Sequence, residues 1–241
     1  MNTDTSTKNN PSRKDVFRMF DRIAARYDFL NHFLSFYRDK VWRRRLAQQL
    51  PARDDLDVLD LATGTADQLL ALFKTRKVKS GIGVDPAEKM LAIGRRKIEK
   101  KNLADKIKLL PGSAENLPFG NNTFDVVAIS FGIRNVTNVT RALSEMHRVL
   151  RQGGRALILE FSLPRNRLIR KIYLLYFRKI LPRLCGFIAG DRHAYHYLNE
   201  TVEVFPYGEE FCALMRAAGF TGTRARPMTF GVATLYRGDK Q

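Results

Sequence analysis

Long hydrophobic runs, cysteines and acidic residues are all scarce in this 241-residue chain. No stretch approaches the roughly 20 uninterrupted apolar residues that a membrane-spanning helix requires. The polar first ten residues lack the apolar core of a signal peptide. The two cysteines, Cys185 and Cys212, lie in apolar surroundings without the spacing of metal ligands, which predicts small buried thiols. We therefore expect a cytoplasmic protein.

The shortage of acidic residues leaves a large positive charge. Against 42 lysines and arginines stand only 24 aspartates and glutamates, so the formal net charge is +18. Such a charge favours an anionic partner, either a nucleic acid or the surface of an anionic membrane, and does not choose between them. The hydrophobic share of 44% is ordinary for a globular protein, and the length suffices for one α/β domain with a helical addition.

One segment, Asp57–Asp67, organises the rest of the chain. An apolar strand runs into a turn with a single glycine, Gly64, and then into a helix. In an open α/β sheet, ligands bind beyond the carboxyl ends of the strands, and this first turn is a common anchor. Thr65 and Gln68 have the spacing of a capping box that would start the helix. A second strand ends in Asp85, whose carboxylate could accept hydrogen bonds from two ribose hydroxyls.

The single glycine indicates which nucleoside the turn could bind. A dinucleotide site requires Gly-x-Gly-x-x-Gly, so that the backbone can approach a pyrophosphate closely. A ligand without phosphates, such as S-adenosylmethionine, does not impose that pattern. The alternative is that Gly64 is only a turn residue and that Asp85 caps a helix beginning at Pro86.

Strands and helices alternate in units of about 30 residues, which predicts an α/β fold with a parallel, doubly wound sheet. The predicted strands are 57–61, 81–85, 107–110, 124–130 and 155–161, with closing strands at 222–226 and 229–237. Helices are predicted between these strands. One begins at Pro86, one spans Val139–Leu150, and one runs through Phe211 and ends at Gly219.

Two helical additions flank this alternation within one domain, predicted at 13–241 after a disordered tail at 1–12. Helices predicted within 13–50, with Tyr27–His32 between them, can fold over the carboxyl edge of the sheet, and the run 43–45 is predicted as a solvated face. An insertion at 163–205 is basic and amphipathic. Its apolar residues share a broad helical face, and its basic residues cluster opposite at Arg167, Arg170, Lys171 and Arg178. This helix could dock on an anionic membrane or pack its apolar face on the sheet.

Several motifs carry a family resemblance, in order, over about Val16–Arg237. They are Tyr27–Asn31, Val58–Asp67, Ala114–Phe119, Ser130–Thr137, Gly153–Arg155 with Leu159–Ser162, and Ala194–Leu198 with Phe205–Pro206. The chain resembles the class I methyltransferases of ubiquinone and menaquinone synthesis, which methylate a ring carbon of a prenylated quinol. The resemblance implies a Rossmann-like fold with a seven-stranded, mostly parallel sheet, and S-adenosylmethionine as the cofactor.

The resemblance also implies the positions of the site. The cofactor-binding residues would be Asp60, Thr63, Gly64, Thr65, Asp85, Ser113, Ala114 and Ser130. Ser113 stands where the family usually has Asp or Asn. The catalytic residues would be Arg134, Tyr27, Asp28 and Asn135, and the substrate contacts Asn31, Tyr195 and Tyr197.

The expected reaction displaces the sulfonium methyl by an electron-rich ring carbon, and it depends mainly on positioning. A permanently charged arginine, Arg134, is suited to stabilising a phenolate, and Asp28 or Tyr27 could accept a proton. Alternatively, Arg134 pairs with a carboxylate at the sheet edge, and the tyrosines at 195 and 197 belong to the core. His193 and His196 lack a third ligand nearby, and methyl transfer of this type requires no metal, so no metal is expected.

The expected function is therefore C-methylation of a prenylated quinol, either demethylmenaquinol or a polyprenyl-methoxybenzoquinol. The competing hypothesis is an RNA methyltransferase, motivated by the net charge, but a catalytic Asn/Asp-Pro-Pro-aromatic motif is missing. The expected partners are the quinol and an anionic membrane surface, without nucleic acid, and a homodimer is the assembly considered. The protein would then work at the inner face of the cytoplasmic membrane.

Overall fold

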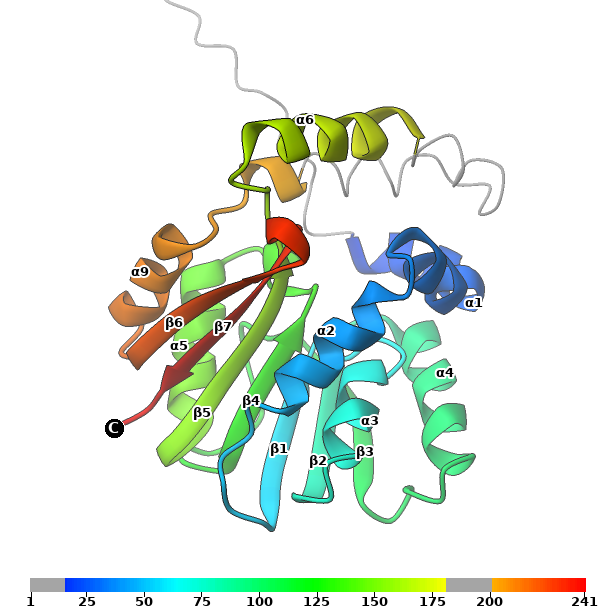
Figure 1. Ribbon diagram of the computed structural model, residues 1–241. Coiled ribbons are helices and arrows are strands. Elements are labelled where there is room, and N and C mark those ends of the chain that lie inside the picture. The colour runs from blue at the N-terminus through cyan, green and yellow to red at the C-terminus, as the bar shows by residue number, and fades with distance from the viewer. Residues whose placement is uncertain (1–15, 181–200) are drawn as a thin grey trace, which may run out of the picture.

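In the computed structural model, which describes residues 16–180 and 201–241, seven strands form one sheet with helices on both faces (Figure 1). The strand order is β3 (Ile107–Pro111), β2 (Val78–Asp85), β1 (Leu56–Leu61), β4 (Phe124–Ser130), β5 (Leu150–Phe161), β7 (Ala233–Asp239) and β6 (Thr221–Met228). The first five strands are parallel, and β7 is antiparallel to both β5 and β6. The predicted doubly wound α/β sheet is confirmed.

The strands follow the apolar runs but extend beyond several of them. All seven residues of β4 are buried, as expected for a parallel strand covered on both faces. β2 begins three residues before its predicted start, and β5 begins five residues before, because Val78 pairs with Leu56 of β1 and Leu150 pairs with Phe124 of β4. The last strand begins at Ala233 instead of Thr229, since Thr229 and Phe230 adopt positive φ in a 3₁₀ turn.

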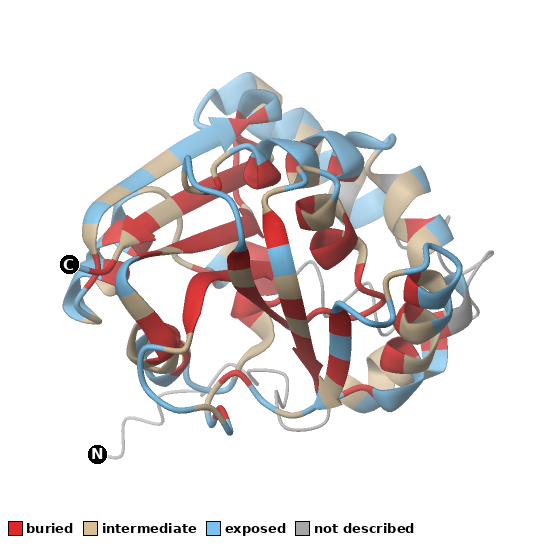
Figure 2. Ribbon diagram, turned by 90° about the horizontal axis from the view of Figure 1, so that it is seen from below, coloured by how far each residue is buried: buried red, intermediate tan, exposed pale blue. Residues whose placement is uncertain are grey.

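Five of the longer helices form two layers on the sheet, and two others, the first and the one that begins at Arg167, lie outside these layers. They are α1 (Val16–Leu34), α2 (Arg38–Ala47), α3 (Asp67–Phe73), α4 (Glu88–Glu99), α5 (Val139–Val149), α6 (Arg167–Leu175, continued by a π-helical turn at Tyr176–Ile180) and α9 (Glu209–Ala217). Helices α2, α3 and α4 pack on one face of the sheet, and α5 and α9 pack on the other. Buried residues follow the strands and the inward sides of these helices (Figure 2). Cys212 is a buried free thiol in α9, as predicted, and Cys185 lies outside the described residues.

Three local predictions about helices are wrong. The Thr65–Gln68 capping box is absent, because α3 starts after Ala66 in a left-handed conformation and the Thr65 hydroxyl donates to Asp28 instead. Helix α4 begins at Glu88, two residues after Pro86. The Tyr27–Asn31 motif lies inside α1, and not between two helices.

The first N-terminal helix, α1, covers the carboxyl edge of the sheet, as predicted, whereas α2 packs on one face. Ala24 of α1 packs with Ala87 and Met90 at the start of α4, so α1 sits directly over the loops that follow the strands. Helix α6 lies above that edge and has no fully buried residue (Figure 1). Among the described residues, none of the helices is long and apolar enough to span a membrane.

The contact between the turns after β1 and β4 should tolerate no added methyl group. A Cβ at Gly132 would lie 2.4 Å from the Cβ of Ala62. This distance is shorter than any real contact between two Cβ atoms, so the backbone would have to shift. We expect Gly132→Ala to lower the free energy of unfolding by about 1–3 kcal/mol through overpacking, measured by urea denaturation.

Gly120→Ala is the control, because its nearest neighbour, Thr123 Oγ1, would be 3.8 Å away. The double variant Ala62→Gly with Gly132→Ala removes the clashing methyl and should recover most of the loss. Equal stability of Gly132→Ala and Gly120→Ala would contradict the contact.

Candidate functional site

The site lies where the chain reverses its order across the sheet, between β1 and β4. Such a crossover opens a crevice at the carboxyl ends of the strands, which is where ligands bind in open α/β sheets. The backbone there adopts unusual conformations: φ is 47° at Ala62, 53° at Gly64, 65° at Ala66 and 59° at Phe131. Left-handed non-glycine residues persist only where their surroundings over-determine them, and they concentrate at functional sites.

A cavity of about 290 Å³ opens at this crevice, at the lower end of the range for ligand pockets. Helix α1 contributes apolar residues to it, namely Val16, Phe17 and Phe20. Most of the remaining lining comes from the ends of β2 and β4 and from the loops after β1, β2, β3 and β4. Seven of the predicted site residues line it: Tyr27, Gly64, Asp85, Ser113, Ala114, Ser130 and Asn135.

Asp85 is held by two backbone groups. Gly64 N donates to its Oδ2 and Ala87 N donates to its Oδ1, each at 2.8 Å. The bond from Ala87 is a local turn and does not cap the helix as the alternative considered from the sequence required, because α4 has Ala87 as its N-cap and no side-chain cap. Burial raises the pKa of the carboxyl to about 6. Because each oxygen keeps a free lone pair, the carboxylate presents a fixed pair of acceptors suited to two neighbouring hydroxyls.

A second, small cavity of about 20 Å³ adjoins the first. The two share the lining residues Tyr27, Ala62, Gly64 and Ser130. Asp60, Thr63, Thr65 and Gln68 line only the small one, together with Asp67 and Arg43. The structure therefore places all eight predicted cofactor-binding residues on one cavity or the other. Burial raises the pKa of Asp60 to about 7, although Thr63 donates to its Oδ2 at 2.6 Å.

Asp28 lines neither cavity and instead fastens α1 to the turn after β1. Its Oδ1 accepts a hydrogen bond from the Thr65 hydroxyl at 2.6 Å. Lys97 of α4 bridges Asp28 and Asp67, with N–O distances of 2.6 Å to each. These bonds hold α1, and with it the adjoining Tyr27, against the turn after β1.

Tyr27 lines both cavities. Burial raises the pKa of its hydroxyl, while a side-chain hydrogen bond with Asn31 and the charges of Arg43 and Arg134 oppose that rise. The hydroxyl is therefore protonated near neutral pH and can donate a hydrogen bond. Asn31, predicted as a substrate contact, reaches the site through this tyrosine.

Arg134 is buried and paired, which matches the alternative considered from the sequence. Its Nη1 donates to Glu160 Oε1 at 2.6 Å and to the carbonyl of Phe131 at 2.7 Å. It does not line either cavity, although its charge reaches Tyr27. Asn135 does line the larger cavity, and its buried Oδ1 makes no hydrogen bond among the described residues. The predicted contacts Tyr195 and Tyr197, and both histidines near them, lie outside those residues.

Sequence reasoning missed Arg43. The run 43–45 was expected to be solvated, and Arg44 and Arg45 are indeed exposed, but Arg43 is half-buried and lines the small cavity. The missed signal is helical spacing: Asp39, Trp42, Arg43 and Leu46 follow the i, i+3, i+4, i+7 pattern of one helix face.

Comparison with solved structures gives the fold. A SAM-dependent methyltransferase from Thermotoga maritima superposes with a TM-score of 0.63 over 94% of this chain and all of that one, at 21% identity. A SAM-dependent methyltransferase from Aquifex aeolicus superposes with a TM-score of 0.60 over 83% of this chain and 89% of its own, at 15% identity. The fold is the Rossmann-like fold of class I methyltransferases.

Comparison of sequences is more specific. A family model described as the ubiE/COQ5 methyltransferase family matches residues 6–240. The "Ubiquinone/menaquinone biosynthesis C-methyltransferase UbiE" of Geobacter sulfurreducens is 47% identical over 92% of this chain and 87% of its own. The "Demethylmenaquinone methyltransferase" of Thermus thermophilus is 44% identical over 92% of this chain and its own full length.

The Arg134–Glu160 pair should make a large contribution to stability. Glu160→Gln leaves the Arg134 charge buried without its counter-charge, and we expect a loss of about 3–5 kcal/mol in the free energy of unfolding, measured by denaturation. Glu209→Gln is the matched control, because its pair with Arg216 is exposed and is worth at most about 1 kcal/mol. Similar losses in the two variants would show that burial adds nothing to the Arg134 pair.

Proposed function

The chain belongs to the ubiE/COQ5 methyltransferase family, and on that premise we propose which substrate it takes and which residues act. It is an S-adenosylmethionine-dependent C-methyltransferase that acts on a quinol. We propose demethylmenaquinol as the substrate, with a polyprenyl-methoxybenzoquinol as the second candidate. The relative from Thermus thermophilus, which is named for demethylmenaquinone, supports that order.

The residues of the two joined cavities fit the cofactor. Asp85 presents two fixed acceptors for a ribose diol, and Ser113 and Ala114 line the side where the adenine would lie. At the other end, the buried Oδ1 of Asp60 makes no hydrogen bond among the described residues and can accept one from an ammonium group. When bound, the cofactor supplies an activated methyl group on a sulfonium. The observation that supports this assignment most strongly is the pair of backbone hydrogen bonds that fixes the Asp85 carboxylate at the cavity.

The protein's own part in the reaction is positioning and charge. A quinol hydroxyl resembles tyrosine, with a pKa of about 10, so its anion requires support at neutral pH. We propose that the protonated Tyr27 hydroxyl donates to the quinol oxygen and that Asn135 accepts from the same ring. Arg134 contributes a buried positive charge near Tyr27, and Asp28 keeps α1 in register through Thr65. The apolar residues of α1 exclude water from the cavity.

The assignment is tested by activity and by binding. Incubation with labelled S-adenosylmethionine and reduced short-tail demethylnaphthoquinone should yield a product whose methyl lies on a ring carbon, as located by mass spectrometry. Asp85→Ala should weaken binding of S-adenosylhomocysteine by about tenfold or more, because it removes charge-assisted hydrogen bonds to the ribose.

Asp105→Ala is the control for that variant, because Asp105 is exposed on the connection between α4 and β3. Calorimetry and circular dichroism together separate lost affinity from lost fold. An unchanged affinity in a folded Asp85→Ala protein would remove the cofactor assignment. A methyl found on oxygen would overturn the assignment of C-methylation.

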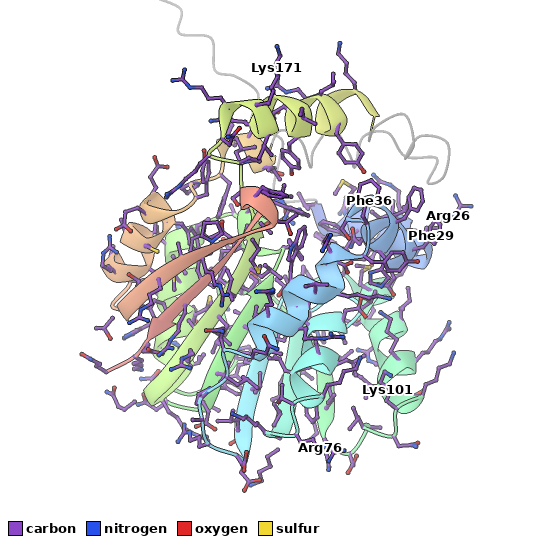
Figure 3. All side chains as sticks on the ribbon, viewed as in Figure 1. Arg26, Phe29, Phe36, Arg76, Lys101 and Lys171 are labelled. Atoms are coloured by element: carbon purple, nitrogen blue, oxygen red, sulfur yellow. The ribbon has the colours of Figure 1, made fainter. Side chains whose placement is uncertain are left out.

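We also propose peripheral association with an anionic membrane through α6. Leu168, Ile172 and Leu175 form an exposed apolar stripe on this helix, at 68%, 60% and 51% exposure. Lys171 points away from the body of the protein beside that stripe (Figure 3). The opposite side packs inward, where Tyr173 and Leu174 contact a core cluster with Ile23 and Leu30 of α1. The exposed side therefore supports docking on a membrane, whereas the inward side packs on the cluster with α1 and not on the face of the sheet, which the alternative from the sequence required.

Vesicle co-sedimentation at low salt tests the membrane proposal. We expect binding to vesicles that contain phosphatidylserine, and Lys171→Gln should weaken it about fivefold, since each basic group near such a surface contributes about 1 kcal/mol. Lys101→Gln is the matched control, because Lys101 is exposed at the opposite end of the molecule (Figure 3). Equal effects of the two changes, or no binding by the unaltered protein, would contradict docking through α6.

The remaining predictions about partners have different support. The net charge motivated an RNA methyltransferase as the alternative, but the relatives reported above are named as quinone methyltransferases, which favours a quinol. Absence of nucleic acid and assembly into a homodimer stay predictions.

A further inference from the structure

Two groups of opposite charge, the buried Asp60 and the half-buried Arg43, line the small cavity, and each has one buried atom without a hydrogen-bond partner among the described residues. Asp60 is 1% exposed, and its Oδ1 makes no hydrogen bond among the described residues. Arg43 reaches the same cavity from α2, and its Nε is likewise buried and unbonded there. Burying a charged donor or acceptor costs free energy unless a hydrogen-bond partner replaces the lost water. Two such atoms without partners at one cavity therefore require an explanation.

Neighbouring groups do not provide that partner. The charge of Arg43 lowers the pKa of both Asp60 and Asp67, so the guanidinium is near both carboxylates. Nevertheless, no ion pair of Arg43 occurs within the described part of the chain. Asp67 is already bonded to Lys97, and Asp60 uses its other oxygen to accept from Thr63.

Arg43 is held in place by contacts that leave its donors available. Its guanidinium carbon lies 5.3 Å from the centre of the Phe131 ring, and its carbonyl accepts a 3.5 Å bond from Gln68. A ring engages the face of a guanidinium, whereas the N–H donors point outward in its plane. On the same helix face, Trp42 donates to Thr229 and Leu46 is fully buried, which fixes the rotation of α2. The guanidinium is therefore pre-positioned for a planar anion.

We infer that Arg43 and Asp60 form a receptor for a zwitterionic α-amino acid group, namely the methionine end of the cofactor. Arg43 donates to the carboxylate, and the Oδ1 of Asp60 accepts from the ammonium. This inference rests on the proposed function and adds Arg43 to the binding site. The two cavities share Tyr27, Ala62, Gly64 and Ser130, so a ligand with its ribose at Asp85 extends past these residues toward Arg43.

The amino acid end and the nucleoside end of the ligand should contribute to its affinity independently. S-adenosylhomocysteine carries both the nucleoside and the amino acid, whereas 5′-methylthioadenosine carries the nucleoside and the thioether alone. By calorimetry, Arg43→Met should weaken binding of S-adenosylhomocysteine about tenfold or more and leave that of 5′-methylthioadenosine within about twofold. Arg43→Lys should recover part of the lost affinity, because it restores the charge without the planar fork.

Arg44→Met is the matched control, since Arg44 is the exposed neighbour on the same helix and the change in net charge is the same. It should leave both affinities unchanged. If Arg43→Met weakens both ligands equally, or weakens neither, the receptor is wrong.

A measurement on the unaltered protein covers the case in which Arg43→Met does not fold. The decarboxylated analogue of S-adenosylhomocysteine keeps the amine and lacks the carboxylate, so it should bind about tenfold more weakly than the parent. Equal affinities would overturn the role of Arg43. If none of the three ligands binds, the cofactor assignment itself fails, and that outcome is distinct from a failure of the receptor alone.

Discussion

The site depends on one carboxylate that joins two strand ends. Asp85 closes β2, and its oxygens accept from Gly64 N in the turn after β1 and from Ala87 N before α4. These bonds hold the loop after β1 in its left-handed conformations. That loop positions Thr63, which donates to Asp60, and Thr65, which donates to Asp28. Because the same carboxylate faces the larger cavity, the group that orders the loops is also the group offered to the ligand.

The charge distribution separates two tasks. The excess of basic residues, +18 overall, has exposed members such as those of α6, whereas several of the scarce acidic residues are buried at the site or beside it. Asp60, Asp85 and Glu160 are all buried, and burial raises the pKa of the first two toward neutrality. Buried carboxylates are costly unless a donor or cation meets them, so those with incomplete partners mark where a ligand is expected.

The helical additions complete what the sheet begins. The strand ends supply backbone and carboxylates, but α1 closes the cavity with apolar side chains and Tyr27, and α2 brings Arg43. The bridge from Lys97 to Asp28 and Asp67 fastens α1 to the turn after β1, so the cover and the floor of the site are positioned together. Helix α6 then lies above the carboxyl edge of the sheet (Figure 1), and an apolar stripe on it is exposed.

Local pattern was enough to predict the sheet and the glycine turn after β1, because apolar periodicity and strand-end motifs act over a few neighbouring residues. The eight cofactor-loop residues came from the family resemblance, and their role stays a proposal. The tertiary structure decided what those patterns could not. Arg134 became the partner of Glu160, and Thr65 bonded to Asp28 instead of capping a helix. Arg43 turned inward while Arg44 stayed in solvent. The reason is physical: which partner satisfies a buried charge depends on residues brought together across 26 or 37 positions of chain, as for Arg134–Glu160 and Thr65–Asp28, and spacing alone does not carry that distance.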